Sequence, residues 1–247
     1  MPSSHRAARG QMSDSLLTAS FIILSGGLQD AYTYLCRGKV FANAQTGNIV
    51  LLSAYLFEGD TARAVRYLAA AAGPGGDIRL EGVDYRHLSA VATMLRQAGC
   101  RLTCGETSIR LQAPRRLQSA GPIRTAPYPG FPTDAQAVLM ASLLRSEGAT
   151  VFVENIFDSR YRHVPEMVRM GADIRLEGRV AVVCGVDRLH GAAVRAKELR
   201  GGASLVLAGL QAEGETAVTG VEHIQRGYED LTGELAQLGA DIRQEER

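Results

Sequence analysis

Hydrophobic and polar positions along this chain repeat the same pattern three times. In each copy a short apolar strand leads through a turn into a helix, and the helix ends at a glycine: Gly99, Gly171 or Gly239. The stretches of sequence between these closing glycines are nearly equal in length. Self-similarity at a nearly fixed period indicates one supersecondary unit that is used repeatedly. The pattern therefore predicts three strand–helix–strand units.

The first copy shows the periodicity of its helix most clearly. Leu88, Val91, Met94 and Leu95 recur at helical spacing, so they form one apolar face. Each helix is expected to end at its closing glycine, because glycine adopts the left-handed conformation of a helix C-terminus without steric cost. New strands are expected directly after these glycines, at residues 101–104, 173–176 and 241–243.

Two more helices are predicted between the copies, over residues 135–145 and 203–211. Strands that alternate with helices in this way indicate an α/β fold. The net charge of +1 and the lack of interleaved aromatic and basic residues argue against a nucleic-acid partner. The four cysteines form no CxxC pair, so we expect buried thiols in a reducing compartment and no metal site.

Residues 1–66 follow a different pattern. Residues 16–28 are almost uncharged, but they are fewer than the roughly 20 residues that a membrane-spanning helix needs. The segment resembles the start of a family of multi-span bacterial membrane proteins. That resemblance rests on the sequences GGLQDA (26–31), FAN (41–43), TGNIVLL (46–52) and EGD (58–60).

Two parts of the chain are therefore expected. Residues 1–66 are predicted to be an apolar, helical, membrane-protein-like segment, and residues 67–247 an α/β domain. Membrane contact would then run through residues 14–57. The alternative is an amphipathic N-terminal extension.

The candidate chemistry begins in a proline-rich loop. Pro127, Pro129 and Pro132 stiffen the backbone just before the helix predicted at 135–145. A rigid loop that delivers the Asp134 carboxylate to a helix start is a way to hold a catalytic acid or base in place. The alternative is that Thr133 or Asp134 only caps the helix.

Arginines recur at related positions in the repeats. Arg86, Arg160 and Arg226 precede the closing glycines of their copies by nearly the same interval, and Arg200 lies just before another predicted helix. Guanidinium groups bind carboxylate and phosphate through two parallel hydrogen bonds. Several of them around one opening would bind a small polyanion, whereas a single arginine is more often solvated or ion-paired. Gly201 and the glycine after it would let the backbone approach a ligand closely.

Residues 67–247 resemble the C-terminal portion of the UDP-N-acetylglucosamine 1-carboxyvinyltransferases, a family of enolpyruvyl transferases. Four segments carry this resemblance: TAPYPGFPTDAQA (125–137), FDSRYRHVPEMVRMGADI (157–174), KELRGGASLVLAG (197–209) and HIQRGYE (223–229). The resemblance implies an inside-out α/β barrel, in which each of two similar domains is built from three repeated units. It also implies a cytoplasmic enzyme of peptidoglycan precursor synthesis that needs no cofactor.

The implied reaction transfers enolpyruvyl from phosphoenolpyruvate to the 3-hydroxyl of UDP-N-acetylglucosamine, and phosphate is released. By resemblance, Asp134 matches the carboxylate that handles the proton of the sugar hydroxyl. Arg160, Arg200 and Arg226 match the arginines at the phosphoenolpyruvate end of the site. The remaining positions that match substrate contacts of the family are Pro132, Thr133, Phe157 and Asp158.

The chain also departs from the family pattern. Asp158 and Ser159 stand where the family usually has Glu and Asn, while Glu198 and Gln225 each replace an Asp. The family's N-terminal domain carries a lysine that binds phosphoenolpyruvate and a mobile loop with the proton donor, and residues 1–70 match neither. The chain is therefore expected to be chimeric or truncated, with little activity alone and with self-association through the exposed interdomain surface.

Three hypotheses of different class remain open. The first is a carboxyvinyltransferase that uses the C-terminal part of the family's site. The second is an inactive remnant, or a module that binds a UDP-sugar. The third is a membrane-associated protein of unknown function, governed by the segment 1–66.

Overall fold

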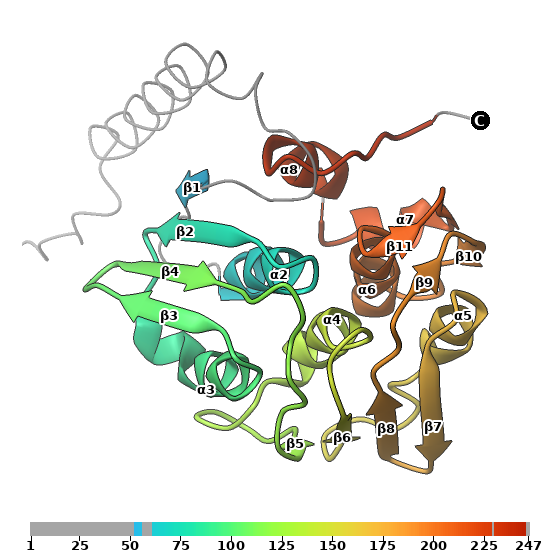
Figure 1. Cartoon of the computed structure of the whole chain (residues 1–247), viewed down its shortest axis with the longest axis horizontal. Coiled ribbons are helices and arrows are strands. Elements are labelled where there is room, and N and C mark those ends of the chain that lie inside the picture. The colour runs from blue at the N-terminus through green and yellow to red at the C-terminus, as the bar shows by residue number, and fades with distance from the viewer. Residues whose placement is uncertain (1–51, 56–60, 229, 246–247) are drawn as a thin grey trace, which may run out of the picture. The chain divides into compact units, whose positions relative to one another are not determined.

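The computed structural model describes residues 52–55, 61–228 and 230–245. Figure 1 labels the elements of this part. The helices are α2 (Thr61–Ala72), the 3₁₀ turn η3 (Tyr85–Leu88), α3 (Ser89–Gln97), α4 (Thr133–Ser142), α5 (Val164–Arg169), α6 (Leu199–Gly209), α7 (Val221–Gln225) and α8 (Leu231–Gln237). The strands are β1 (Leu52–Tyr55), β2 (Asp77–Glu81), β3 (Arg101–Cys104), β4 (Ser108–Gln112), β5 (Ile123–Arg124), β6 (Ala149–Val153), β7 (Asp173–Glu177), β8 (Val180–Cys184), β9 (Leu189–His190), β10 (Ala193–Arg195), β11 (Ala212–Glu213) and β12 (Ala217–Thr219).

The strands form two four-stranded sheets of the same design. Their orders are β1-β2-β4-β3 and β5-β6-β8-β7. In each sheet the first two strands are parallel, and the last strand of the copy runs antiparallel between its two neighbours. Among the described residues, the third copy contains two parallel pairs, β9 with β11 and β10 with β12. The α/β class is therefore confirmed.

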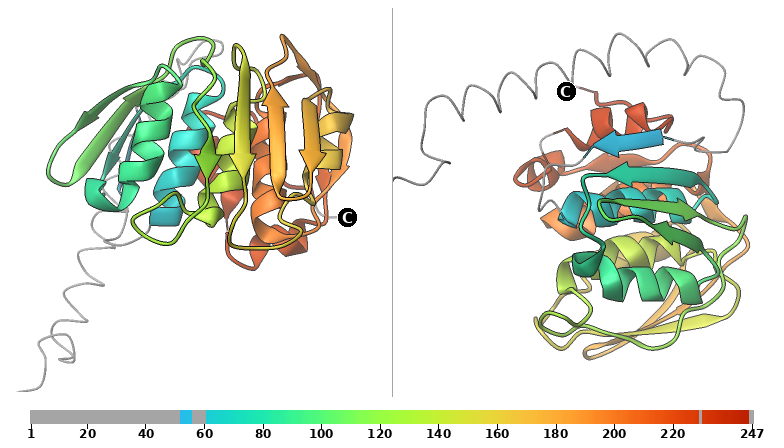
Figure 2. Two further views of the ribbon diagram at one scale, coloured as in Figure 1. Left: turned by 90° about the horizontal axis from the view of Figure 1, so that it is seen from below. Right: turned by 90° about the vertical axis from the view of Figure 1, so that its left-hand side faces the viewer.

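Three helices form the centre of this part of the chain. Figures 1 and 2 show α2, α4 and α6 side by side, with α4 in the middle and the sheets around them. All residues of α4 from Ala135 to Ser142 are buried. A helix that is apolar on every side is stable only in such surroundings, and Ala, Leu and Met favour the helical conformation.

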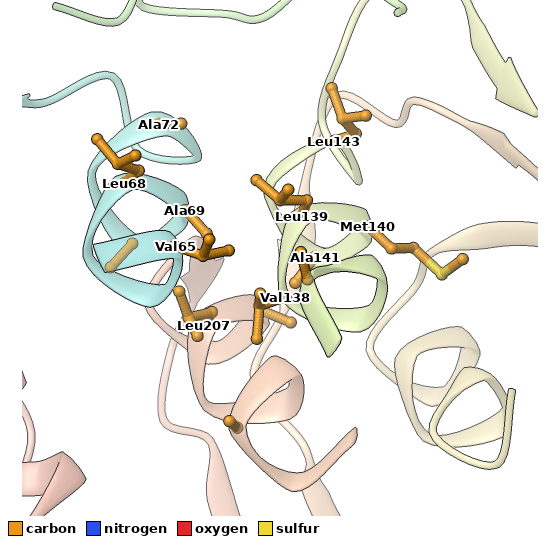
Figure 3. Close-up of a cluster of buried hydrophobic side chains, with 14 of the residues drawn as sticks. Val65, Leu68, Ala69, Ala72, Val138, Leu139, Met140, Ala141, Leu143 and Leu207 are labelled. Carbon is orange, nitrogen blue, oxygen red and sulfur yellow. The ribbon is translucent and has the colours of Figure 1, made fainter. Parts of the chain in front are cut away.

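Polar side chains also connect these helices. The Ser142 hydroxyl donates to the Ala69 carbonyl of α2 at 3.0 Å, and Gln211 Nε2 donates to the Ala141 carbonyl at 3.0 Å. Figure 3 shows Val65, Leu139 and Leu207 of the three helices in one apolar cluster. The helices predicted at 135–145 and 203–211 are present, but each begins and ends a few residues earlier.

The closing glycines end their helices as predicted. Gly99, Gly171 and Gly239 have φ angles of 92°, 93° and 86°. The N–H of the residue after each glycine donates to the carbonyl five residues before it, which satisfies a carbonyl that the helix leaves free. These bonds are Cys100 to Leu95 at 2.9 Å, Ala172 to Met167 at 3.2 Å and Ala240 to Leu235 at 3.0 Å.

The strand predicted at 241–243 is wrong. The first two closing glycines are followed by β3 and β7, but residues 240–245 lie in no strand. A strand needs a neighbour to bond its N–H and C=O groups, and this segment has none among the described residues. Three equivalent units are therefore not established, because the described residues of the third form no four-stranded sheet like those of the other two.

The predicted N-terminal segment falls largely outside the described residues, including the apolar run at 16–28. Of residues 1–66, the structure describes 52–55, which form β1, and 61–66, which begin α2. No helix in the described part of the chain is long and apolar enough to cross a bilayer.

Replacing Leu139 by alanine should destabilise the protein, because this side chain is fully buried at the centre of the three helices. We expect the free energy of unfolding to fall by about 2–5 kcal/mol. Urea denaturation measures this change. Val168→Ala is the matched control, since Val168 is 46% exposed on α5, and a similar loss in both variants would contradict the central role of these helices.

Candidate active site

Asp134 is held between two arginines. Arg160 Nη2 donates to Asp134 Oδ1 at 2.8 Å. Arg200 contacts the same carboxylate twice, through Nε to Oδ1 at 2.5 Å and through Nη2 to Oδ2 at 2.7 Å. The three residues come from segments that are far apart in the sequence. The fold thus brings together three of the predicted site residues.

The local structure explains why the Asp134 carboxylate is available. The N-cap of α4 is Pro132, which makes no side-chain cap, and Thr133 and Asp134 already lie in the first helical turn. The alternative that Thr133 or Asp134 caps the helix is therefore wrong. Both side chains bond to other segments instead, Thr133 to Glu154 and Asp134 to the two arginines.

Glu154 connects the two loops that carry the site, although sequence reasoning did not single it out. Its carboxylate is buried and accepts hydrogen bonds from the hydroxyls of Thr125 and Thr133, each at 2.9 Å. It also accepts the backbone N–H groups of Ile156 at 2.9 Å and Phe157 at 3.1 Å. One carboxylate thereby fixes the start of α4 relative to the loop that leads to Arg160.

The side chains of that loop diverge. The Phe157 ring is about half exposed, and the Arg160 guanidinium lies 5.0 Å from its centroid. Asp158 points elsewhere, since it forms an ion pair with Arg179. Phe157 therefore lies beside the arginine–carboxylate cluster, while Asp158 is engaged outside it.

Arg226 and Arg86 are not part of this cluster. Arg226 is exposed at the end of α7 and makes no ion pair with any residue that the structure describes. Arg86 is bound by Asp84 through paired hydrogen bonds of 2.6 and 3.0 Å on the turn η3. Of the four arginines at related positions, only Arg160 and Arg200 thus converge on one carboxylate.

A second charged group adjoins the cluster and was missed from the sequence. The Arg66 guanidinium is buried 3.9 Å from the centroid of the Tyr228 ring, and Glu234 pairs with Arg66 at 3.3 Å and with Arg63 at 3.1 Å. Burial raises the pKa of Tyr228, and the positive charges of Arg66 and Arg200 oppose that shift. The available signal was a pair of arginines in an otherwise apolar stretch of α2.

His163 is buried behind Arg160. Both of its ring nitrogens lack a hydrogen-bond partner among the described residues. Burial, and to a lesser degree the charge of Arg160, lowers the pKa of His163 to about 4. A Cβ on Gly201 would lie 3.0 Å from His163 Cβ and 2.5 Å from Glu198 Oε1. The space beside Gly201, where the backbone was predicted to approach a ligand, is therefore occupied by the side chains of Glu198 and His163.

The arrangement suits binding of an anion next to a proton acceptor. Asp134 and Arg200 are the second residues of α4 and α6, where the helix dipole is positive. Arg160 Nε is buried without a partner among the described residues. In the part of the chain that the structure describes, no group of three or more metal-ligating side chains is present.

Replacing Glu154 by glutamine should loosen both loops, because an amide can accept fewer of the four hydrogen bonds and adds donors beside other donors. We expect the free energy of unfolding to fall by about 1–3 kcal/mol. Thermal denaturation compared with Glu213→Gln, whose side chain is 67% exposed, measures the effect. Equal stability of the two variants would refute the linking role of Glu154.

His163 should make the protein less stable in weak acid. Its pKa is lower in the folded protein than the ordinary 6.5, so the unfolded chain binds a proton first as the pH falls. The free energy of unfolding should therefore decrease between pH 6.5 and about 4, and His163→Gln should flatten this slope. His87→Gln, at an exposed histidine, is the control; the same flattening in both variants would point to another group.

Known protein families and structures match most of this chain. Residues 43–235 match the family described as EPSP synthase (3-phosphoshikimate 1-carboxyvinyltransferase). UDP-N-acetylglucosamine 1-carboxyvinyltransferase of Myxococcus xanthus is 50% identical over 186 residues, which are 75% of this chain and 44% of that protein. UDP-N-acetylglucosamine 1-carboxyvinyltransferase 2 of Caldanaerobacter subterraneus subsp. tengcongensis is 48% identical over 71% of this chain and 42% of that protein. The chain thus spans less than half the length of these relatives.

Two solved structures share the fold. The enolpyruvyl transferase NikO from Streptomyces tendae matches with a TM-score of 0.67 and 27% identity, over 74% of this chain and 43% of that one. EPSP synthase from Acinetobacter baumannii matches with a TM-score of 0.57 and 19% identity, over 79% of this chain and 46% of that one. Since the family match covers most of its residues, the chain belongs to the EPSP synthase family.

Proposed function

We propose that this chain supplies part of the active site of a UDP-N-acetylglucosamine 1-carboxyvinyltransferase. The observation that carries the proposal is the Asp134 carboxylate held by Arg160 and Arg200 at 2.5–2.8 Å. The sequences around these residues are those that resemble the transferase. Relatives of 48–50% identity with this name support the same assignment.

In the proposed reaction, the sugar 3-hydroxyl attacks C2 of phosphoenolpyruvate while a proton is added to C3. Asp134 accepts the proton of the hydroxyl, which makes the oxygen a better nucleophile. Phosphate then leaves the tetrahedral intermediate, C3 loses a proton, and the carbon–carbon double bond forms again. Arg160, Arg200 and Arg226 neutralise the carboxylate and phosphate charges of phosphoenolpyruvate, and positioned cations of this kind stabilise a charged transition state.

The other site residues would bind the UDP-sugar. Phe157 offers an exposed aromatic face, and Pro132 and Thr133 border Asp134 at the start of α4. Asp158 would have to leave Arg179 to contact a ligand. Ligand binding must also open the Asp134 cluster, because phosphoenolpyruvate and Asp134 compete for the same two arginines.

The proposed site is incomplete in this chain. By resemblance, the lysine that binds phosphoenolpyruvate and the residue that protonates C3 come from the half of the transferase that this chain does not match. We therefore propose little or no turnover by the chain alone. Within the family's inside-out barrel, the chain would provide one of two domains, with three repeated units.

Two further proposals concern the surroundings of the site. Self-association is proposed through the surface that would meet the other domain of the family's fold. The protein would act in the cytoplasm, because both proposed substrates are intracellular. Membrane contact through residues 14–57 stays a prediction. A UDP-sugar-binding module without catalysis is the second candidate, favoured by the missing proton donor.

Phosphate release from phosphoenolpyruvate and UDP-N-acetylglucosamine tests the proposal. We expect activity only after the unmatched half of the Myxococcus xanthus relative is added in trans, and Asp134→Asn should lower it by about 10²–10⁴-fold. Asp173→Asn is the control, since its side chain is 49% exposed compared with 48% for Asp134. Equal activity of the two variants would overturn the role of Asp134. Turnover by the chain alone would overturn the proposal that its site is incomplete.

A further inference from the structure

Arg66 is a buried charge in a helix whose other buried residues are apolar or aromatic. It lies in α2, and its side chain is 6% exposed. Arginine is rarely buried without partners, and both partners of Arg66 lie far along the sequence. Its Nη2 pairs with Glu234 of α8 at 3.3 Å, and its guanidinium lies 3.9 Å from the centroid of the Tyr228 ring. Arg66 therefore connects α2 to the segment that follows α7.

The Tyr228 ring belongs to the same turn as Arg226. The N–H groups of Gly227 and Tyr228 both donate to the Ile224 carbonyl of α7, at 3.3 and 3.0 Å. These bonds continue the helical turn beyond the end of α7. Arg226 and Tyr228 thus lie on one short, hydrogen-bonded turn. A contact that fixes Tyr228 therefore also limits the positions that the Arg226 side chain can reach.

A close backbone contact holds this turn against the start of α6. A Cβ on Gly227 would lie 2.8 Å from Leu199 Cδ2, so glycine allows the turn to approach α6 closely. Leu199 and Arg200 are the first two residues of α6. Figure 1 shows α7 beside α6, and the two helices are in contact. The turn that carries Arg226 is thus supported by two helices, by α6 directly and by α2 through the Tyr228 ring.

Electrostatic effects indicate that Tyr228 also adjoins the arginine–carboxylate cluster of the site. Burial raises the pKa of Tyr228, the positive charges of Arg66 and Arg200 oppose this shift, and the negative charge of Asp134 adds to it. Charges shift a pKa in this way only over short distances, because solvent and salt screen distant charges. Tyr228 is therefore close both to the buried Arg66 and to the site residues Arg200 and Asp134.

We propose that Arg66, by stacking on Tyr228, positions the turn of Arg226 so that Arg226 and Arg200 bind the same anion. The inference rests on the proposed function, which assigns these two arginines to phosphoenolpyruvate. A guanidinium over an aromatic ring is attracted most strongly where water is excluded, and both groups here are at least partly buried. Arg66 does not touch the ligand itself, because its side chain is buried. It is a positioning residue that acts through Tyr228.

The alternative is that Arg66 serves only to attach α8 to α2. Its ion pair with Glu234 has that effect, but Arg63 forms a second ion pair with the same carboxylate at 3.1 Å. Loss of Arg66 would therefore leave α8 joined to α2. The stack on Tyr228 is made by Arg66, so a comparison of the two arginines separates positioning of the turn from attachment of α8.

Binding of phosphoenolpyruvate to the full-length chain, followed by phosphorus NMR, tests the proposal. Arg66→Met removes the guanidinium and keeps a long apolar side chain, and we expect it to weaken binding about tenfold. Arg66→Lys keeps a cation beside the Tyr228 ring and should recover most of the lost affinity. Arg63→Met removes the other ion pair of Glu234 and leaves the stack, so it should change the affinity less than about twofold.

A double-mutant cycle shows whether Arg66 acts through Arg226. In the Arg226→Gln background, Arg66→Met should weaken binding no further. An equal loss in both backgrounds, or an equal loss in Arg63→Met, would overturn the proposal, because Arg66 would then have only a structural role.

A second variant keeps the test valid if Arg66→Met folds poorly. Tyr228→Leu removes the ring and keeps the pair of Arg66 with Glu234, so it should reproduce the loss of affinity, and unchanged affinity in this variant would also contradict the proposal. Failure of the proposed function would look different. In that case the unmodified chain itself would bind no phosphoenolpyruvate, and the inference about Arg66 would fall with it.

Discussion

The burial of α4 on every side is the constraint on which the rest of this structure depends. An apolar helix with no solvent-facing stripe must lie between other elements, and here α2 and α6 flank it. Its charged residue lies in the first turn, whereas its polar residues Gln136 and Ser142 are buried. Asp134 occupies the first turn of α4 and Arg200 the first turn of α6. The packing of the helices therefore brings charged side chains to one place before any ligand is considered.

Carboxylates at this place need ion-pair or hydrogen-bond partners where they are shielded from water, and neighbouring residues supply these partners. Asp134 receives two guanidinium groups and Glu154 four hydrogen-bond donors, so each carboxylate has partners. A buried carboxylate that joined only one loop would cost stability without ordering the site. Glu154 joins two loops, so its burial also determines where Asp134 and Arg160 meet. His163 behind them stays neutral at physiological pH, because its pKa is about 4.

The three copies of the repeated unit are built alike, but among the described residues they are not equally complete. Two copies have complete four-stranded sheets over their helices, whereas the third has only its parallel strands among the described residues. The same helix-ending hydrogen bond recurs in all three, so the third copy folds locally like the others. Among the described residues, β12 of the third copy pairs only with β10. The residues that match make up less than half of the length of these relatives.

Sequence periodicity by itself determined the α/β class, the helices that end at Gly99, Gly171 and Gly239, and the strands β3 and β7, because these follow from local spacing and glycine conformation. The arginine spacing suggested a cluster, yet only tertiary structure could show that Arg160 and Arg200 reach Asp134 while Arg226 does not. The strand expected at 241–243 failed for the same reason. A helix is satisfied by its own hydrogen bonds, but a strand and an ion pair both depend on a partner elsewhere in the chain.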